Sequence, residues 1–149
     1  MLFTGQYEHV IDAKQRLAIP ADIRSRWRPE TDGLAWFAVP WPGGVIRLYP
    51  ESRFNALAES RSQTLTPDED EAEIQASLFG LSRRVEMDSA GRVRLPEDML
   101  QLTGVNGEVA LIGAGDRLEI RDRASWQASM AQRLASLPGL IARKAKHGG

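Results

Sequence analysis

Two short stretches of the chain repeat one arrangement of an acid, an arginine and a proline. The first reads DAKQRLAIPADI over residues 12–23, and the second reads DSAGRVRLPEDM over residues 88–99. In both, an arginine follows the aspartate by four residues and a proline follows it by eight. A guanidinium can donate two parallel hydrogen bonds to a phosphate or to the O6/N7 edge of guanine. The spacing therefore leaves two interpretations open: an ion pair that braces a turn, or an arginine that contacts nucleic acid.

The repetition extends well beyond these stretches. With an offset of 76 residues, Arg16, Leu17 and Ile19 correspond to Arg92, Val93 and Leu95; further on the offset falls to 72, and Leu48 corresponds to Ile120. Duplication of one unit explains this pattern. The predicted division is a first unit over 5–61, an acidic linking helix over 62–80, a second unit over 81–135 and a basic tail over 136–149.

Alternation of apolar and polar residues predicts strands on both sides of each turn. Around the second turn the apolar set and the polar set alternate with a period of two: Val85, Met87, Val93 and Leu95 against Glu86, Asp88, Arg92 and Arg94. This is typical of a half-buried hairpin with the aspartate and arginine on its outer face. His9 falls on the inner face of the first copy. A second strand pair is predicted in each copy, over 34–39 with 45–49 and over 108–113 with 117–121.

Helices are predicted after each set of strands. Pro20 and Pro96 are expected at the first position of short helices, and Asp122 is expected to cap a helix that presents Trp126, Met130, Leu134 and Leu137. In the first copy Phe54, Leu57 and Ala58 share one helix face. In the linking helix, TPDE over 66–69 reads as a capping box, followed by apolar residues at 74, 78, 81 and 85.

Composition narrows the possible functions. Hydrophobic residues make up 42% and charged residues 26% of the 149, as in ordinary folded domains. No apolar run is long enough to span a membrane, no export signal is evident, and cysteine is absent, which fits a cytoplasmic protein. With two distant histidines and no catalytic motif, we expect no metal, no cofactor and no enzyme activity. The net charge of −1 combines +1 over residues 1–61, −5 over 62–82 and +3 over 83–149.

The stretches GQYEHVIDAKQRLAIPADIR, DSAGRVRLPEDM and GAGDRLEIRDRASW resemble the MraZ family of bacterial transcriptional regulators. The resemblance implies a β-rich α+β fold: two tandem AbrB-like (SpoVT-AbrB) modules whose swapped hairpins form a double-split β-barrel. It also implies chains assembled into a homo-oligomeric ring at the nucleoid, bound to double-stranded promoter DNA. The regulated genes would be the division and cell wall cluster, whose promoter carries direct repeats. Carried over by position, the DNA-binding residues are Asp12, Lys14, Arg16, Asp88, Arg92 and Arg94.

One position departs from the family pattern. The first turn usually reads Asp-x-Lys-Gly-Arg, but Gln15 stands here at the glycine, whereas Gly91 is present in the second turn. If this position requires a positive φ, glutamine costs on the order of 1 kcal/mol. The alternative function is a ring-forming protein-interaction or antitoxin-like module without specific DNA binding. Salt distinguishes the two, because DNA affinity falls steeply as counterions are released.

Overall fold

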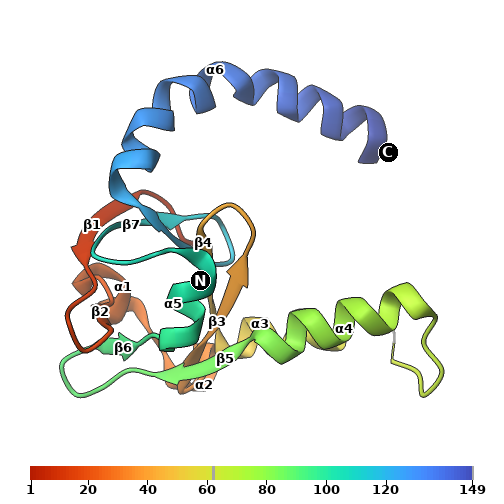
Figure 1. Ribbon diagram of the computed structural model, residues 1–149, viewed down its shortest axis with the longest axis horizontal. Helices are drawn as coiled ribbons and strands as arrows, with labels where there is room; N and C mark the ends of the chain where they lie inside the picture. Colours follow the sequence, from red (N-terminus) through yellow and green to blue (C-terminus); the bar gives the residue numbers. More distant parts are fainter. Residues whose placement is uncertain (62, 149) are drawn as a thin grey trace.

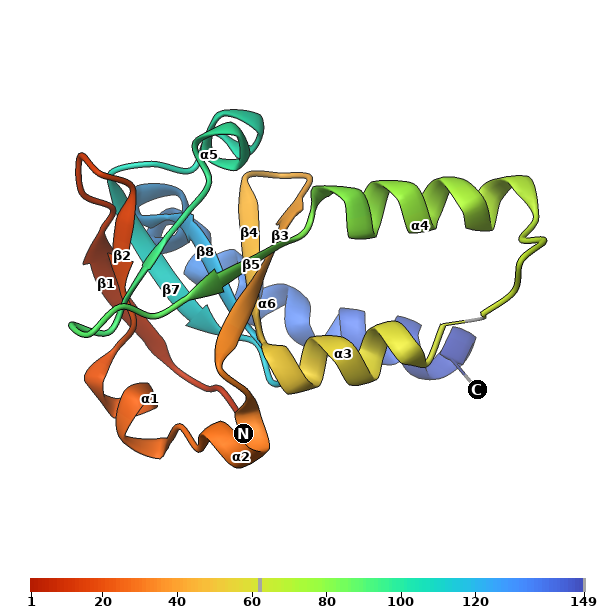
Figure 2. The same ribbon diagram turned by 90° about the horizontal axis from the view of Figure 1, so that it is seen from below.

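The computed structural model describes residues 1–61 and 63–148; residues 62 and 149, which open the acidic linking segment and end the basic tail, lie outside the described part. The fold is mixed α+β, with a mostly antiparallel sheet (Figures 1 and 2). The strands are β1 Gln6–Val10, β2 Arg16–Ala18, β3 Ala35–Trp41, β4 Val45–Pro50, β5 Arg83–Glu86, β6 Arg92–Arg94, β7 Glu108–Gly113 and β8 Leu118–Asp122. The helices are α1 Ala21–Arg26, α2 Pro29–Asp32, α3 Glu51–Glu59, α4 Glu69–Leu81, α5 Glu97–Thr103 and α6 Arg123–Gly148.

Strand pairing interlocks the two copies of the repeat. The main sheet has the order β1-β7-β8-β4-β3-β5, so the first strand of each copy pairs with a strand of the other copy; β2 and β6 form a separate two-stranded ribbon. Leu17 lies opposite Val93, and Arg47 lies opposite Glu119. These pairs are separated by the offsets of 76 and 72 residues found in the sequence. Equivalent residues therefore face each other across a local two-fold relation.

The alternating pattern predicted the faces of the strands correctly. Val93, Leu95, Leu17 and Ile19 are almost fully buried, while the residues between them face outward. The predicted pairs over 34–39 with 45–49 and over 108–113 with 117–121 are confirmed as β3–β4 and β7–β8. The hairpin around Asp88 is confirmed only at its turn. Beyond the Met87–Val93 bridge, β5 leaves to pair with β3 and β6 leaves to pair with β2.

One hydrophobic core serves both copies. Trp36 is fully buried at its centre, and its ring packs against Trp27 and Phe3 at centroid distances of 4.8 and 5.8 Å. The core draws on both repeats, including Leu17, Ile46 and Leu48 from the first and Val93, Leu111, Leu118 and Ile120 from the second. A shared core is expected, because a unit of some 55 residues buries too little surface to be stable alone.

Three details of the helix predictions were wrong. Pro20 and Pro96 precede their helices as cap residues with extended ψ, and their carbonyls accept the first helical hydrogen bonds. The cap of α4 is Asp68, whose carboxylate accepts from the Glu71 N–H at 2.8 Å, so Thr66 lies outside the helix. An aspartate is at least as good a cap as a threonine. Val85 is not part of the helical stripe, because α4 ends at Leu81 and Val85 lies in β5.

The longer helices extend from the sheet in two places. α3 and α4 run side by side in both views, joined by the Arg61–Glu71 ion pair at 2.9 Å, and Phe54 of α3 stacks on Phe37 at 4.1 Å (Figures 1 and 2). α6 starts at the predicted cap, where Asp122 accepts from the Ser125 N–H at 2.9 Å, and then arches away from α3 and α4 in Figure 1. Within residues 1–61 and 63–148, no helix has both the length and the apolar character needed to cross a membrane.

Candidate nucleic-acid interface

The first Asp–Arg element forms a tight turn around one carboxylate. Asp12 Oδ1 accepts from the backbone N–H groups of Lys14 and Arg16, both at 2.9 Å, and Oδ2 accepts from Arg16 Nε at 2.8 Å. The backbone closes the turn through Asp12 N–H to Arg16 O at 3.0 Å and Gln15 N–H to Asp12 O at 3.0 Å. A single aspartate thus fixes both the shape of the turn and the direction of the guanidinium.

The second element repeats these bonds. Asp88 Oδ1 accepts from the N–H groups of Ala90 and Arg92 at 2.9 Å, and Oδ2 accepts from Arg92 Nε at 3.0 Å. The fourth residue of each turn adopts a positive φ, 61° at Gln15 and 77° at Gly91. The two turns therefore have the same backbone shape, and Gln15 occupies a left-handed conformation that normally favours glycine.

Hydrogen bonding keeps both carboxylates charged. The Arg16 backbone N–H, followed by the Arg16 side chain and the Lys14 N–H, holds the pKa of Asp12 below its ordinary value despite partial desolvation. The pKa of Asp88 is lowered in the same way, first by the Arg92 N–H and then by the Ala90 N–H and the Arg92 side chain. Both acids are therefore ionised at neutral pH, and each partly neutralises the arginine that it orients.

The ribbon of β2 and β6 brings the arginines of the two turns to one face. Leu17 and Val93 point into the core, so their neighbours on each strand point outward. Arg16 lies opposite Arg94, and Ala18 lies opposite Arg92. Like charges at directly opposed positions repel each other. The ribbon thus carries three guanidinium groups on a two-stranded surface, and an anion lying on it would relieve their repulsion.

The terminal nitrogens of these arginines remain available. In the described part of the chain, the side-chain hydrogen bonds of Arg16 and Arg92 involve only Nε, which leaves both Nη groups directed away from the turn. Arg94 and Lys14 are exposed, and neither side chain has an ion-pair partner among residues 1–61 and 63–148. The six residues predicted from the sequence thus fall on or beside the ribbon, with Asp12 and Asp88 as positioning groups. Their contact with DNA remains a prediction.

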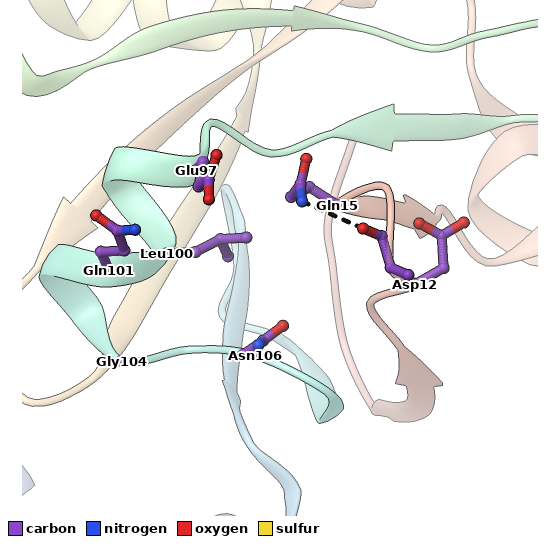
Figure 3. A pocket seen from close by; sticks show the side chains of 8 residues that line it. Asp12, Gln15, Glu97, Leu100, Gln101, Gly104 and Asn106 are labelled. Atoms are coloured by element: carbon purple, nitrogen blue, oxygen red, sulfur yellow. Dashed lines mark hydrogen bonds between the residues drawn. The ribbon is translucent and has the colours of Figure 1, made fainter.

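A shallow pocket lies beside the first turn only. It has a volume of about 420 Å³ and is lined by Asp12, Ala13, Gln15, Glu97, Leu100, Gln101, Gly104 and Asn106 (Figure 3). The Gln15 side chain lies at its edge, where Nε2 donates to the Ala13 carbonyl at 3.3 Å. The space beside the left-handed residue is open here, so a long side chain is accommodated.

At the second turn the corresponding space is filled by Arg24. Its Nε donates to the Ile19 carbonyl at 2.9 Å, and a Cβ placed on Gly91 would lie 2.3 Å from Arg24 Cδ. The sequence gave no signal for this contact, because Arg24 belongs to the other copy of the repeat. With the offset of 76 residues its counterpart is Leu100, which lines the pocket at the first turn.

No competing site emerges at the titratable residues. In the described part of the chain, no group of three or more histidine, aspartate or glutamate side chains could hold a metal ion. His9 lies half-buried on β1, as predicted, and burial lowers the pKa of its imidazole. Glu119 is buried and bonded to Arg117 and Arg121 at 2.8 and 2.7 Å, which is a structural ion cluster.

The fold and the ribbon define a class: an internally duplicated α+β protein whose two copies interlock to present paired arginine turns on one surface. Residues 78–143 match the family described as "MraZ protein, putative antitoxin-like". A relative from Thermomicrobium roseum, named Transcriptional regulator MraZ, is 32% identical over 149 residues, covering 91% of this chain and 99% of its own. Relatives of that name from Heliobacterium modesticaldum and Dehalococcoides mccartyi are 31% and 33% identical, covering 84% and 85% of this chain and 84% and 86% of their own. The chain belongs to the MraZ family.

Proposed function

We propose that this protein is a transcription regulator that binds double-stranded promoter DNA through the outer face of the β2–β6 ribbon. Family membership and the names of the relatives support the regulatory role. The observation that carries the DNA contact is the placement of Arg16, Arg92 and Arg94 together on one face, two of them oriented by a carboxylate that leaves their Nη groups free. The protein would act in the cytoplasm at the nucleoid, and not as an enzyme.

The ribbon suits the major groove in size and chemistry. Paired strands lie about 4.8 Å apart, so two strands with their side chains fit a groove about 12 Å wide. Arg16 and Arg92 would read guanine edges or clamp phosphates, because their Nη donors are already aimed outward. Lys14 and Arg94, which lack an acidic partner in the described structure, would contact phosphates.

Assembly would compensate for the modest charge of one chain. We propose that the two copies act as AbrB-like modules of a double-split β-barrel, and that chains associate into a ring. Each subunit would then present the same ribbon, so several weak contacts would combine at high effective concentration. Direct repeats in DNA, such as those expected upstream of the division and cell wall cluster, match identical ribbons on neighbouring subunits.

The first prediction concerns Arg16→Ala combined with Arg92→Ala. Each arginine that reads a base contributes about 1–3 kcal/mol, so the double variant should lose more than 100-fold in affinity for DNA from upstream of its own gene. Fluorescence anisotropy at fixed salt measures this, with each single variant run beside it. The matched control is Arg53→Ala, which removes an exposed arginine on α3, outside the ribbon. The melting temperature should be nearly unchanged, because exposed ion pairs add little stability.

Salt separates this function from docking to a protein partner. If Z phosphates are contacted, log affinity should fall with log salt with a slope of about −0.9Z, and the double variant should show a shallower slope. Equal affinity for the wild type, the double variant and Arg53→Ala would contradict the ribbon as the DNA contact. A wild-type affinity without salt dependence would favour the antitoxin-like or protein-interaction role.

A further inference from the structure

The outer half of α6 has no partner within its own chain. Among the described residues, the last side chain of α6 that contacts another aromatic or polar group in the first half is Arg133, which lies over Trp126 at 4.4 Å and donates to Ser129. No hydrogen bond, ion pair or ring contact in the described part of the chain ties residues 137–147 to another element. Four apolar side chains there are 48–73% exposed: Leu134, Leu137, Leu140 and Ile141. A helix of this length with an uncovered apolar stripe is only marginally stable in water.

An apolar groove of about 510 Å³ lies between α4 and the end of β3. Its apolar lining consists of Pro40, Trp41, Pro42, Ile74, Leu78 and Leu81. Trp41, Ile74 and Leu81 are each 42–47% exposed although they sit side by side. The Arg47 guanidinium lies over the Trp41 ring at 4.0 Å, which holds this wall of the groove in place. The groove is therefore formed without a ligand and faces solvent.

The stripe on α6 matches the stripe on α4 in spacing. Leu134, Leu137 and Ile141 are separated by three and then four residues; read from its C-terminal end, α4 presents Leu81, Leu78 and Ile74 with the same separations. Two helices laid antiparallel would therefore bring these side chains together in three successive layers. The small residues Gly80 and Gly139 flank the layers and allow the helices to approach closely.

Charge selects the same direction. Beyond Ile74, towards its start, α4 carries Glu73, Glu71, Asp70 and Glu69. Beyond Ile141, towards its end, α6 carries Arg143, Lys144 and Lys146. The antiparallel arrangement places the basic end of α6 against the acidic start of α4, whereas the parallel arrangement would leave both charge clusters unpaired. In Figure 1, α6 of the same chain lies well away from α4, so the occupant must come from another molecule.

We propose that the α4–β3 groove receives the outer half of α6 from a second copy of this chain. Each subunit offers one groove and one helix, so the contact is head-to-tail and closes into a ring, or continues as a filament if the angle does not close. This inference deepens the self-association proposed above and is independent of DNA binding.

Two single variants and their mixture test the contact. Ile141→Asp disables the helix and Ile74→Asp disables the groove; both side chains are exposed, so the melting temperature should change little. Sedimentation velocity should show that each variant is monomeric at about 20 µM, whereas the wild type is oligomeric. Leu102→Asp, at a leucine that is 68% exposed on α5, is the matched control and should assemble like the wild type.

The mixture distinguishes a head-to-tail contact from a symmetric one. The intact helix of Ile74→Asp can enter the intact groove of Ile141→Asp, so an equimolar mixture should form a dimer and nothing larger. Because the chain has no cysteine, Ile74→Cys in one chain and Ile141→Cys in another should form a disulfide-linked dimer only when mixed.

The proposal is overturned if the wild type is monomeric, if both aspartate variants keep the wild-type size, or if a chain with both cysteines crosslinks within itself. These results would leave the DNA proposal intact. Conversely, unchanged DNA binding by the arginine double variant would leave the α6–α4 contact intact.

Discussion

The turns at Asp12 and Asp88 have the same hydrogen bonds but different surroundings. Both aspartates accept two backbone N–H bonds and orient an arginine through Nε, and both turns contain a residue with positive φ. At the first turn that residue is Gln15 beside an open pocket; at the second it is Gly91 beneath Arg24. The shape of the turn thus depends on the aspartate, and the residue type at the left-handed position depends on what packs over it.

This contrast assigns separate roles to residues that look alike in the sequence. Asp12 and Asp88 are equivalent in structure, and so are Arg16 and Arg92. Gly91 is required for steric reasons in addition to its φ, since an added Cβ would meet a side chain from the other copy. Gln15 tolerates strain in the backbone because nothing opposes its side chain. The second turn also carries Arg94 where the first carries Ala18, so it presents more positive charge.

The largest effect on stability is expected from Gly91→Ala. Alanine at φ 77° is strained, and its Cβ would displace Arg24 from its hydrogen bond to the Ile19 carbonyl. Together these should cost about 2 kcal/mol, or a fall of roughly 4–8 °C in melting temperature. Urea unfolding measures the free energy. Adding Arg24→Ala should recover the steric part, and a double-mutant cycle without coupling would show that Arg24 does not constrain this turn.

A smaller effect of opposite sign is expected from Gln15→Gly. Glycine removes the strain at φ 61°, which is about 1–2 kcal/mol, but makes the unfolded chain more flexible by about 0.4–1 kcal/mol. The net stabilisation should be about 0.5–1 kcal/mol in urea unfolding. The control Gln101→Gly changes a glutamine of α5 that lines the same pocket and should destabilise the protein. Destabilisation by Gln15→Gly would mean that the Gln15 side chain contributes more than its backbone conformation costs.

The sequence was sufficient to predict which side of each strand faces the core, because burial follows a period of two and leaves Val93 and Arg92 on opposite faces. It also predicted the turns and the Asp122 cap, since these depend on residues close in the chain. It did not predict that β5 leaves Met87 to pair with β3, because periodicity encodes faces and not partners. The packing of Arg24 over Gly91 was missed for the same reason: it joins residues 67 positions apart, and only the interlocked fold brings them together.

The smallest expected effect concerns pH and tests whether the two turns are electrostatically equivalent. Because the folded-state pKa of Asp12 and of Asp88 is lowered, the stability that each contributes is fully present above its unfolded pKa of about 3.9 and is lost as pH falls through the folded value. Asp12→Asn and Asp88→Asn should each lower the free energy of unfolding at pH 7 and lessen its decline between pH 5 and pH 2. Both variants should do so equally, since the same set of N–H donors surrounds each carboxylate. A decline that changes in only one variant would show that the unlike neighbours Gln15 and Arg24 outweigh the shared hydrogen bonds, and the equivalence of the two turns would then be geometric only.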